Sequence, residues 1–376
     1  MVRELGPAAA WFNAPLASGI VWSFSRAHPS LSLGPPTMQK SPADAGAAIA
    51  LRYASPEAAR TLLAEPAGIL GVVGFGAPAS DALPAPCPFI AAPLSPIGSE
   101  AMLEIWSTNA PCTPVTLGAV WGACSPALAF GAITLDEAGP GSLETVVEAA
   151  YLNIFDFLDQ TGFAAPIRFW NYVRDITRHD GGIERYRRFN IGRHRAFAAR
   201  LRQDLPPAAS GVGAHHGHSV IYFLAAHQPA QTVENPRQMS AYAYPPLYGP
   251  RSPSFSRAGL HRLGARSTLF VSGTASITGH ETRHPGDLRG QIAETIENLR
   301  VLGAAAEHAA SLPLGDHQAF KIYLHESAYR DQVDQAITEA FGADCPRLYL
   351  HGAICRSELL VEIEAVRQHD PGMRLF

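Results

Sequence analysis

An α+β fold is predicted for this chain, mainly from the order of hydrophobic patterns in its last third. The patterns indicate a strand at 267–278, a helix at 287–309, a strand at 321–327, a helix at 329–342 and strands at 347–354 and 359–367. This β–α–β–α–β–β order is typical of a sheet with helices packed on one face. The last strand alternates apolar side chains with Glu362 and Glu364, so both carboxylates are expected on the same face of the sheet.

Similar but weaker signals occur earlier in the chain. Residues 68–75 (GILGVVGF) are typical of a buried strand, and apolar residues recur at helical spacing over 143–161. The apolar run 114–135 contains a Ser-Pro pair and three glycines, which favours buried strands joined by a turn over a membrane-spanning helix. Two prolines at 206–207 interrupt the pattern. The length and this break predict two domains, 1–205 and 206–376.

Three segments are predicted to be loops. The segments 28–46 and 76–99 are rich in Pro, Ser, Gly and Ala. A third, 228–258, contains six prolines together with three tyrosines and three arginines. Disordered segments are usually poor in aromatic residues, so we interpret 228–258 as an ordered binding loop.

Composition excludes several classes of function. The chain is 47% hydrophobic and 16% charged, with a formal net charge of −4 and no long basic block, which argues against a nucleic-acid partner. Five cysteines without a Cys-x-x-Cys pair make a disulfide framework or a thiolate zinc site improbable. The first residues, MVRELGPAAAWF, lack the pattern of a signal peptide. A cytoplasmic protein without a membrane partner is expected.

The C-terminal order of elements, with the sequences that form it, resembles the reactive-intermediate deaminase (YjgF/RidA) family, whose fold is also described as chorismate-mutase-like. The resemblance is carried by LFVSGTASITG, GDLRGQIAETIENL, KIYL, CPRLYL and LLVEIEAVR, over roughly residues 265–369. Members of that family form trimers with active sites between subunits.

Over residues 150–369 the chain resembles the chorismatases more closely. The stretches that carry this resemblance are RFWNYVRDI, YRRFNIGRHRAF, GVGAHHGHSVIYFLAA, VENPRQMSAYAYPPLYGPRSPSFSRA, VSGTASITGHET and ICRSELLVEIEA. It implies a clear RidA-like copy at the C-terminus and a degenerate copy of the fold before it. A monomer or a homotrimer is therefore expected. The substrate implied is chorismate, with no metal or organic cofactor.

Chorismate carries two carboxylates, which arginine side chains grip through two parallel hydrogen bonds. The candidates are Arg257, Arg193 and Arg251. The family resemblance favours Arg257 and Arg193, and the alternative for each of the three is an exposed or ion-paired arginine. Hydroxyl positioning calls for neutral donors, and the candidates for this role are Tyr172, Tyr244 and Tyr248. A packing role is the alternative for each tyrosine.

Cleavage of an enol ether begins with proton delivery to its methylene carbon, so the acid must stay protonated near neutral pH. The resemblance places the catalytic glutamate of the family at Glu362 in the VEIE motif. Without the resemblance, a solvated strand face would be the simpler interpretation of Glu362 and Glu364.

Cys355 lies seven positions before Glu362, as in the chorismatases that make 3-hydroxybenzoate. The resemblance therefore implies protonation by Glu362, attack by the ring hydroxyl, loss of pyruvate and aromatisation assisted by Cys355. Gly273 and Ala275 in SGTASI are the implied pocket residues, and alanine there is compatible with 4-hydroxybenzoate as an additional product.

Several alternatives remain open at this stage. Within the same class, chorismate could be hydrolysed to 3,4-dihydroxycyclohexa-1,5-diene carboxylate and pyruvate. Outside it, the chain could be a ligand-binding protein or an imine deaminase, the latter because Arg347 lies where deaminases carry a carboxylate-binding arginine. Metal binding by the histidines at 215, 216 and 218 is not favoured, since no carboxylate follows at ligand spacing.

Overall fold

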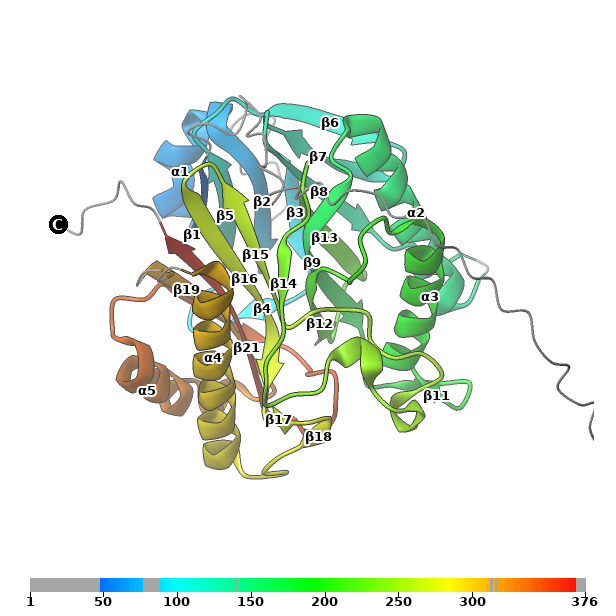
Figure 1. Cartoon of the computed structure of the whole chain (residues 1–376), viewed down its shortest axis with the longest axis vertical. Helices are drawn as coiled ribbons and strands as arrows, with labels where there is room; N and C mark the ends of the chain where they lie inside the picture. The colour runs from blue at the N-terminus through cyan, green and yellow to red at the C-terminus, as the bar shows by residue number, and fades with distance from the viewer. Residues whose placement is uncertain (1–47, 77–87, 140, 312–313, 315–316, 370–376) are drawn as a thin grey trace, which may run out of the picture. The chain divides into compact units, whose positions relative to one another are not determined.

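The computed structural model describes residues 48–76, 88–139, 141–311, 314 and 317–369. The predicted loop at 28–46 and the segment assessed for a signal peptide lie outside the described residues. Figure 1 shows strands in the middle of the molecule, with helices α4 and α5 on one side and α2 and α3 on the other. The strands belong mainly to three sheets, and the mixed α+β class predicted from the sequence is confirmed.

The C-terminal sheet has the order β14-β15-β16-β21-β19-β20-β4. Its strands are β14 (Gln231–Val233), β15 (Ala258–Leu263), β16 (Arg266–Ala275), β21 (Val361–His369), β19 (His317–Leu324), β20 (Arg347–His351) and β4 (Ser95–Pro96). Helices α4 (Leu288–Ala310) and α5 (Arg330–Phe341) cover its outer face. The side chain of Asp287 caps α4 by accepting a hydrogen bond from the Gly290 backbone, which explains why the helix begins there.

The middle sheet has the order β12-β9-β13-β8-β7-β6. Its strands are β6 (Thr113–Leu117), β7 (Val120–Cys124), β8 (Leu128–Thr134), β9 (Ala165–Arg174), β12 (Ala208–Ala214) and β13 (Val220–Ala226). Helices α2 (Leu143–Thr161) and α3 (Arg185–Arg200) pack on its outer face. The basic charge of α3 is directed largely to α2, as in the pairs Arg188–Glu144 and Arg200–Asp156. This pairing explains the basic sequence of α3 without a membrane or RNA partner.

A smaller N-terminal sheet has the order β1-β5-β2-β3. Its strands are β1 (Ile49–Ala54), β2 (Ile69–Phe75), β3 (Phe89–Ala92) and β5 (Met102–Thr108), and helix α1 (Pro56–Ala64) packs on one face. The segment 76–99, predicted to be a loop, therefore contains β3 and β4 in its described part. Both strands are very short; β3 pairs with the preceding strand β2, and β4 pairs with the distant β20, so local composition gave no signal for them.

The three sheets share one strand arrangement. Four neighbouring strands run β16-β21-β19-β20 in the C-terminal sheet, β8-β13-β9-β12 in the middle sheet and β1-β5-β2-β3 in the N-terminal sheet. In each set the first two neighbouring pairs are antiparallel and the last pair is parallel. The middle sheet thus includes β12 and β13, and it crosses the domain boundary predicted between residues 205 and 206. The physical reason is that β9 and β12 are parallel, and a parallel pair needs a crossover such as α3.

The inner faces of the three sheets meet in one core rich in aromatic residues. The rings of Trp170 and Tyr222 are stacked with centroids 4.6 Å apart, and Trp106 lies 5.4 Å from Trp170. Trp106, Trp170 and Tyr323 come from different sheets, so the core fixes how the inner faces are positioned.

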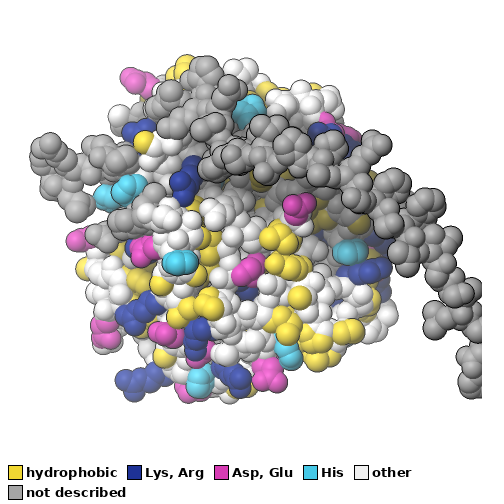
Figure 2. Space-filling model, viewed as in Figure 1, with side chains coloured by type: hydrophobic (Ala, Val, Ile, Leu, Met, Phe, Trp, Pro, Cys, Tyr) yellow, Lys and Arg dark blue, Asp and Glu magenta, His cyan; other side chains and the backbone are white. Residues whose placement is uncertain are grey.

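The surface and the long loop complete the description. On the face shown in Figure 2, acidic and basic side chains are intermixed over the described surface. No helix among the described residues is both long enough and apolar enough to cross a membrane. The segment 228–258 forms β14 and two short 3-10 helices, Ala241–Ala243 and Pro246–Tyr248.

Candidate active site

Strand β21 carries two buried carboxylates on its inner face. The side chains of Val361, Ile363 and Ala365 lie on the outer face of the sheet, in the hydrophobic core that it forms with α4 and α5. Glu362 and Glu364 point the other way, and each is only 4% exposed. The solvated strand face considered in the sequence analysis is therefore wrong for this pair, because the inner face is covered by the other sheets.

Glu364 is held as a carboxylate by four donors. Arg168 Nη2 lies 2.8 Å from Oε2, Trp170 Nε1 lies 2.7 Å from Oε1, and Lys321 Nζ lies 2.8 Å from Oε1. The Ser210 hydroxyl donates to Oε2. Burial alone would raise the pKa of Glu364, but Lys321 and Arg168 bring it below its ordinary value. Glu364 is thus a fixed negative charge.

Glu362, two residues earlier on the same face, is in the opposite state. Burial, and next the negative charge of Glu364, raise its pKa to about 8, against the opposing effect of Arg168 and Arg257. At neutral pH this carboxyl is protonated and can donate a proton. Gly273 makes room for it, because a Cβ at position 273 would lie 1.9 Å from Glu362 Oε1.

Cys355 lies on the segment that leads into β21. Burial, and then the nearby Glu362, raise the pKa of its thiol to about 12. Cys355 is therefore a neutral thiol at physiological pH and can donate a weak hydrogen bond, whereas a thiolate nucleophile would need a lowered pKa.

Two predicted arginines are buried and incompletely paired. Arg257 Nη2 donates to Met239 O at 2.9 Å and to Tyr244 Oη at 2.8 Å. Arg193 Nη2 donates to Asn190 Oδ1 at 2.9 Å. The Nε atoms of both arginines have no hydrogen-bond partner among the described residues. Buried guanidinium groups with spare donors are suited to binding an anionic ligand.

A pocket of about 270 Å³ lies beside these groups, although Glu362, Arg257 and Arg193 are not among its lining residues. Among its lining residues are Tyr244, Tyr248, Cys355, Tyr186, Phe255 and Arg356. Tyr244 and Tyr248 come from the 228–258 loop, and Cys355 comes from the segment before β21. The structure therefore brings together elements that are more than 100 residues apart in the chain.

The remaining predicted residues lie in three different settings. Ala275 is buried and pairs in register with Glu362. Tyr172 is fully buried and its hydroxyl contacts those of Tyr222 and Tyr323, so it belongs to the core beneath the site. Arg251 is exposed and is not among the residues that line this pocket.

Arg347, the residue that kept the deaminase alternative open, is engaged by α5. Its Nη1 lies 2.8 Å from Asp334 Oδ1 and 2.7 Å from Thr338 Oγ1. The guanidinium therefore stabilises the packing of α5 against β20 and is turned away from the pocket residues above.

Most residues that line the pocket were missed in the sequence analysis, and two of them, Tyr186 and Arg356, bear directly on the site. Tyr186, at the start of α3, lines the pocket together with Cys355, and burial, Cys355 and Glu362 raise the pKa of its hydroxyl. Arg356 stacks on Tyr248, with its guanidinium carbon 4.2 Å from the ring centroid. Because Arg356 directly follows Cys355 in the sequence, it could have been predicted as a site residue. Tyr186 lies in one of the quoted family motifs but has no local signal that separates it from a packing residue.

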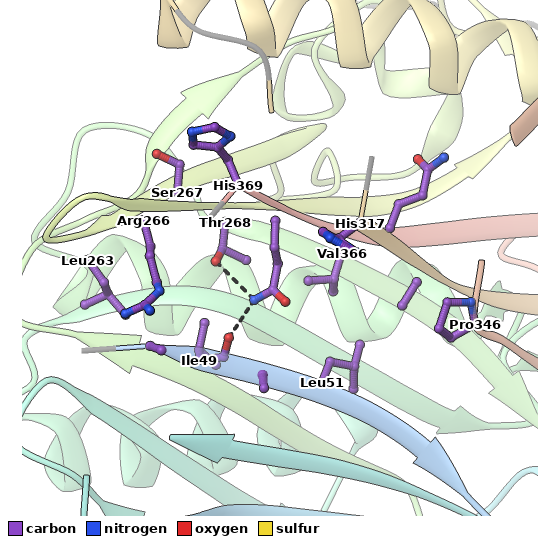
Figure 3. A pocket seen from close by; sticks show the side chains of 15 residues that line it. Ile49, Leu51, Leu263, Arg266, Ser267, Thr268, His317, Pro346, Val366 and His369 are labelled. Carbon is purple, nitrogen blue, oxygen red and sulfur yellow. Dashed lines mark hydrogen bonds between the residues drawn. The ribbon is translucent and has the colours of Figure 1, made fainter. Parts of the chain in front are cut away.

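A second cavity, of about 330 Å³, lies between β1 and the strands β16, β19 and β21 (Figure 3). Its walls are mainly apolar, as with Ile49, Leu51 and Val366. Gln368 crosses the gap and donates to Ile49 O at 2.7 Å. Tyr244, Tyr248 and Cys355 line the other pocket, and Gly273 and Arg257 lie close to Glu362, so we assign the candidate active site there.

The histidines set aside as metal ligands remain without a metal-binding arrangement in the described part of the chain. There, no group of three or more His, Cys, Asp or Glu side chains has the geometry to hold an ion. His215 instead packs against the ring of His351, with centroids 5.0 Å apart.

Comparison with known proteins identifies relatives of this chain. Residues 104–225 match the family model "Chorismatase FkbO/Hyg5-like, N-terminal". A 3-hydroxybenzoate synthase of Streptomyces hygroscopicus is 40% identical over 60% of this chain and 70% of its own. A chorismatase of Streptomyces rapamycinicus is 37% identical over 74% of this chain and 86% of its own. A crystal structure of a chorismatase superposes with a TM-score of 0.74, at 27% identity, over 85% of this chain and 98% of that one.

The chain belongs to the chorismatase family and is an enzyme. The family model covers the middle sheet and part of the N-terminal sheet, whereas Glu362, Cys355 and Arg257 lie outside it.

Proposed function

We propose that this enzyme converts chorismate to 3-hydroxybenzoate and pyruvate. The observation that carries the proposal is the protonated carboxyl of Glu362, buried beside the neutral thiol of Cys355 and the guanidinium of Arg257. An acid in this state suits protonation of an enol ether at neutral pH. The names of the relatives, 3-hydroxybenzoate synthase and chorismatase, support the same substrate and product.

Substrate binding would use the buried arginines. Arg257 and Arg193 each have a spare Nε donor, and each can receive one carboxylate of the dianionic substrate. Tyr244 is hydrogen-bonded to Arg257 and lines the pocket, so it orients that guanidinium towards the ligand. Tyr248 and Arg356 form the adjacent wall.

The reaction begins when Glu362 donates its proton to the methylene carbon of the enolpyruvyl group. This creates an oxocarbenium centre and makes the pyruvyl oxygen a better leaving group. The neighbouring ring hydroxyl then forms a new bond to the ring carbon as the bond to the pyruvyl oxygen breaks. Opening of the resulting arene-oxide-like intermediate and loss of a ring proton produce the aromatic ring, with Cys355 moving a proton. One proton returns to Glu362, so no water, metal or organic cofactor is consumed.

The test is incubation of the purified protein with chorismate, followed by pyruvate measurement and chromatography of the aromatic products. Pyruvate is expected in an amount equal to the aromatic products together, which are mainly 3-hydroxybenzoate, with 4-hydroxybenzoate as the additional product to look for because of Ala275. Glu362→Gln, which keeps the shape of the side chain but has no acidic proton, is expected to reduce turnover at least about 1000-fold. Pyruvate accompanied only by the dihydroxycyclohexadiene acid would refute the aromatic product. Absence of pyruvate would refute the substrate.

We infer, in addition, that the N-terminal half contains degenerate copies of the C-terminal fold. The strand order and directions common to the three sheets support this inference. Three such units in one chain also favour a monomer over a homotrimer. Sedimentation equilibrium checks the oligomeric state, for which a mass near 40.2 kDa is expected.

A further inference from the structure

Lys321, on β19, lies between two carboxylates that come from different sheets. Its Nζ is 2.8 Å from Glu364 Oε1 on β21 and 2.5 Å from Glu104 Oε2 on β5 of the N-terminal sheet. All three side chains are buried, with Glu104 and Lys321 at most 1% exposed. Nothing in the reaction described above uses Glu104, although burying a carboxylate is costly unless it serves to balance a charge.

Glu104 is held firmly in this position. Trp106 Nε1 donates to its Oε1 at 2.7 Å, and the Tyr222 hydroxyl donates to the same atom at 3.1 Å. Trp106 is on the same strand as Glu104, while Tyr222 belongs to β13 of the middle sheet. All three sheets therefore contribute to the surroundings of one carboxylate.

The charges of the buried set balance. Arg168 and Lys321 are positive, and Glu364 and Glu104 are negative, so the four charges of this set sum to zero, and Arg257 is a further positive charge that acts on Glu362. Without Glu104 the set would carry one excess positive charge. A positive environment favours the ionised form of a carboxyl group, and Glu362 would then lose the proton that it has to donate.

We propose that Glu104 is a positioning residue that neutralises Lys321 and thereby keeps the Glu362 carboxyl protonated for the reaction. The catalytic role given to Glu104 rests on the proposed function. Its effect on the protonation of Glu362 can be tested without substrate.

Among the described residues, no other group around this set provides the negative charge that Glu104 provides. The hydroxyls of four neighbouring tyrosines have pKa values raised by burial, so they are neutral at physiological pH; they are Tyr53, Tyr172, Tyr222 and Tyr323. The groups that face Glu362 itself are Glu364, Arg168, Arg257, Cys355 and Tyr186. Of these, Cys355 and Tyr186 are also neutral, and Glu364 alone is negative.

The test is the titration of Glu362 in the full-length protein with Glu104→Gln. The glutamine amide can still accept hydrogen bonds from Trp106 and Tyr222 but carries no charge. For each protein, the infrared spectrum of the same protein carrying Glu362→Gln is subtracted. The difference spectrum isolates the carbonyl band of the protonated Glu362 carboxyl. In the wild-type protein this band is expected to disappear with a midpoint near pH 8. In Glu104→Gln the midpoint is expected to fall by about one pH unit.

Tyr222→Phe is the matched control. It removes a hydrogen bond from Glu104 and another from Lys321 without changing any charge, so the midpoint should stay within about 0.3 pH units of wild type. A midpoint unchanged in Glu104→Gln, or shifted equally in Tyr222→Phe, would overturn the proposal.

A double variant, Glu104→Gln with Lys321→Met, removes one charge of each sign. Its midpoint should return to the wild-type value, which loss of packing alone would not produce. The double variant also tests the proposal if Glu104→Gln alone fails to fold. A Glu362 midpoint in the double variant that differs from wild type by a pH unit would contradict the proposed charge balance. The activity assay with chorismate is separate. A shifted infrared midpoint in a protein that makes no pyruvate would preserve this inference and refute the proposed function.

Discussion

The C-terminal and middle sheets have the same four-strand arrangement, yet one carries the candidate acid and the other carries packing residues. Strand β21 of the first corresponds in position to β13 of the second. On its inner face β21 presents Glu362 and Glu364, whereas β13 presents Tyr222 and Leu224 to the same core. One strand position in one fold can therefore serve either chemistry or packing, depending on what the neighbouring strands allow.

The neighbouring strands use glycine in both sheets, with different results. On β16, the absence of a side chain at Gly273 makes room for Glu362 Oε1. On β8, the strand corresponding to β16, Gly131 pairs with Phe223, and a Cβ there would lie 2.3 Å from the Phe223 ring. The two glycines thus open space for an acid in one sheet and for an aromatic ring in the other.

The largest effect expected from this comparison is that of Gly273→Ala. The added methyl group displaces the Glu362 carboxyl, and a misplaced acid is expected to lower kcat/KM for chorismate by about 100-fold or more. Steady-state kinetics with pyruvate detection measures the loss.

Gly131→Ala is the matched control in the middle sheet. Its clash is with a core ring, so a loss of stability of about 2 kcal/mol is expected while the folded protein keeps its kcat. Equal losses of kcat in the two variants would show that the comparison between the sheets has no functional meaning.

The next effect concerns the stability of the fold as a function of pH. The pKa of Glu362 is raised from 4.5 to about 8, so between these values the folded state keeps a proton that the unfolded state releases. Raising the pH through this window therefore destabilises the protein, by on the order of 3 to 5 kcal/mol from this group. Glu362→Gln removes that contribution and should be more stable than wild type at pH 8.5, with a much smaller difference at pH 5.

Urea unfolding at the two pH values measures this difference. Tyr222→Phe, at the packing strand β13, is the comparison variant, because its hydroxyl is neutral throughout this range. Its stability relative to wild type should hardly change between pH 5 and pH 8.5. An equal pH dependence in the two variants would contradict the assignment of the titration to Glu362.

The sequence predicted the elements of the C-terminal sheet well because their periodic patterns are local. The helix expected at 287–309 is α4, Leu288–Ala310, and the strand expected at 359–367 is β21, Val361–His369. The N-terminal sheet was not predicted as a unit. Its pairing depends on contacts such as Ile49 with Thr108, which composition cannot reveal.

The candidate site was predictable to a similar degree. Resemblance to the family identified Glu362, Cys355, Arg257 and Tyr244, which the structure brings into one region. It did not identify Lys321 or Glu104. A single charged residue within an apolar strand has no periodic signature, and its partner lies in another sheet. The one available signal was the presence of Lys321 inside the apolar strand AFKIYL, since buried lysines are rare without a counter-charge.

The smallest effect on the reaction rate is expected from Cys355→Ala. This variant extends the comparison of the two sheets to the segments that precede β21 and β13. Residues 352–360 join β20 to β21 and place Cys355 in the pocket, whereas residues 215–219 join β12 to β13 and include the exposed His216. In the proposed reaction Cys355 is a neutral thiol that acts after the first protonation, so pyruvate formation should fall less than about 10-fold. The aromatic product should instead give way to the non-aromatic diol, as measured by chromatography of the same reactions. His216→Ala should leave both rate and product unchanged. An unaltered product profile in Cys355→Ala would show that the thiol only fills space, because loss of a buried small side chain alone does not redirect a reaction intermediate.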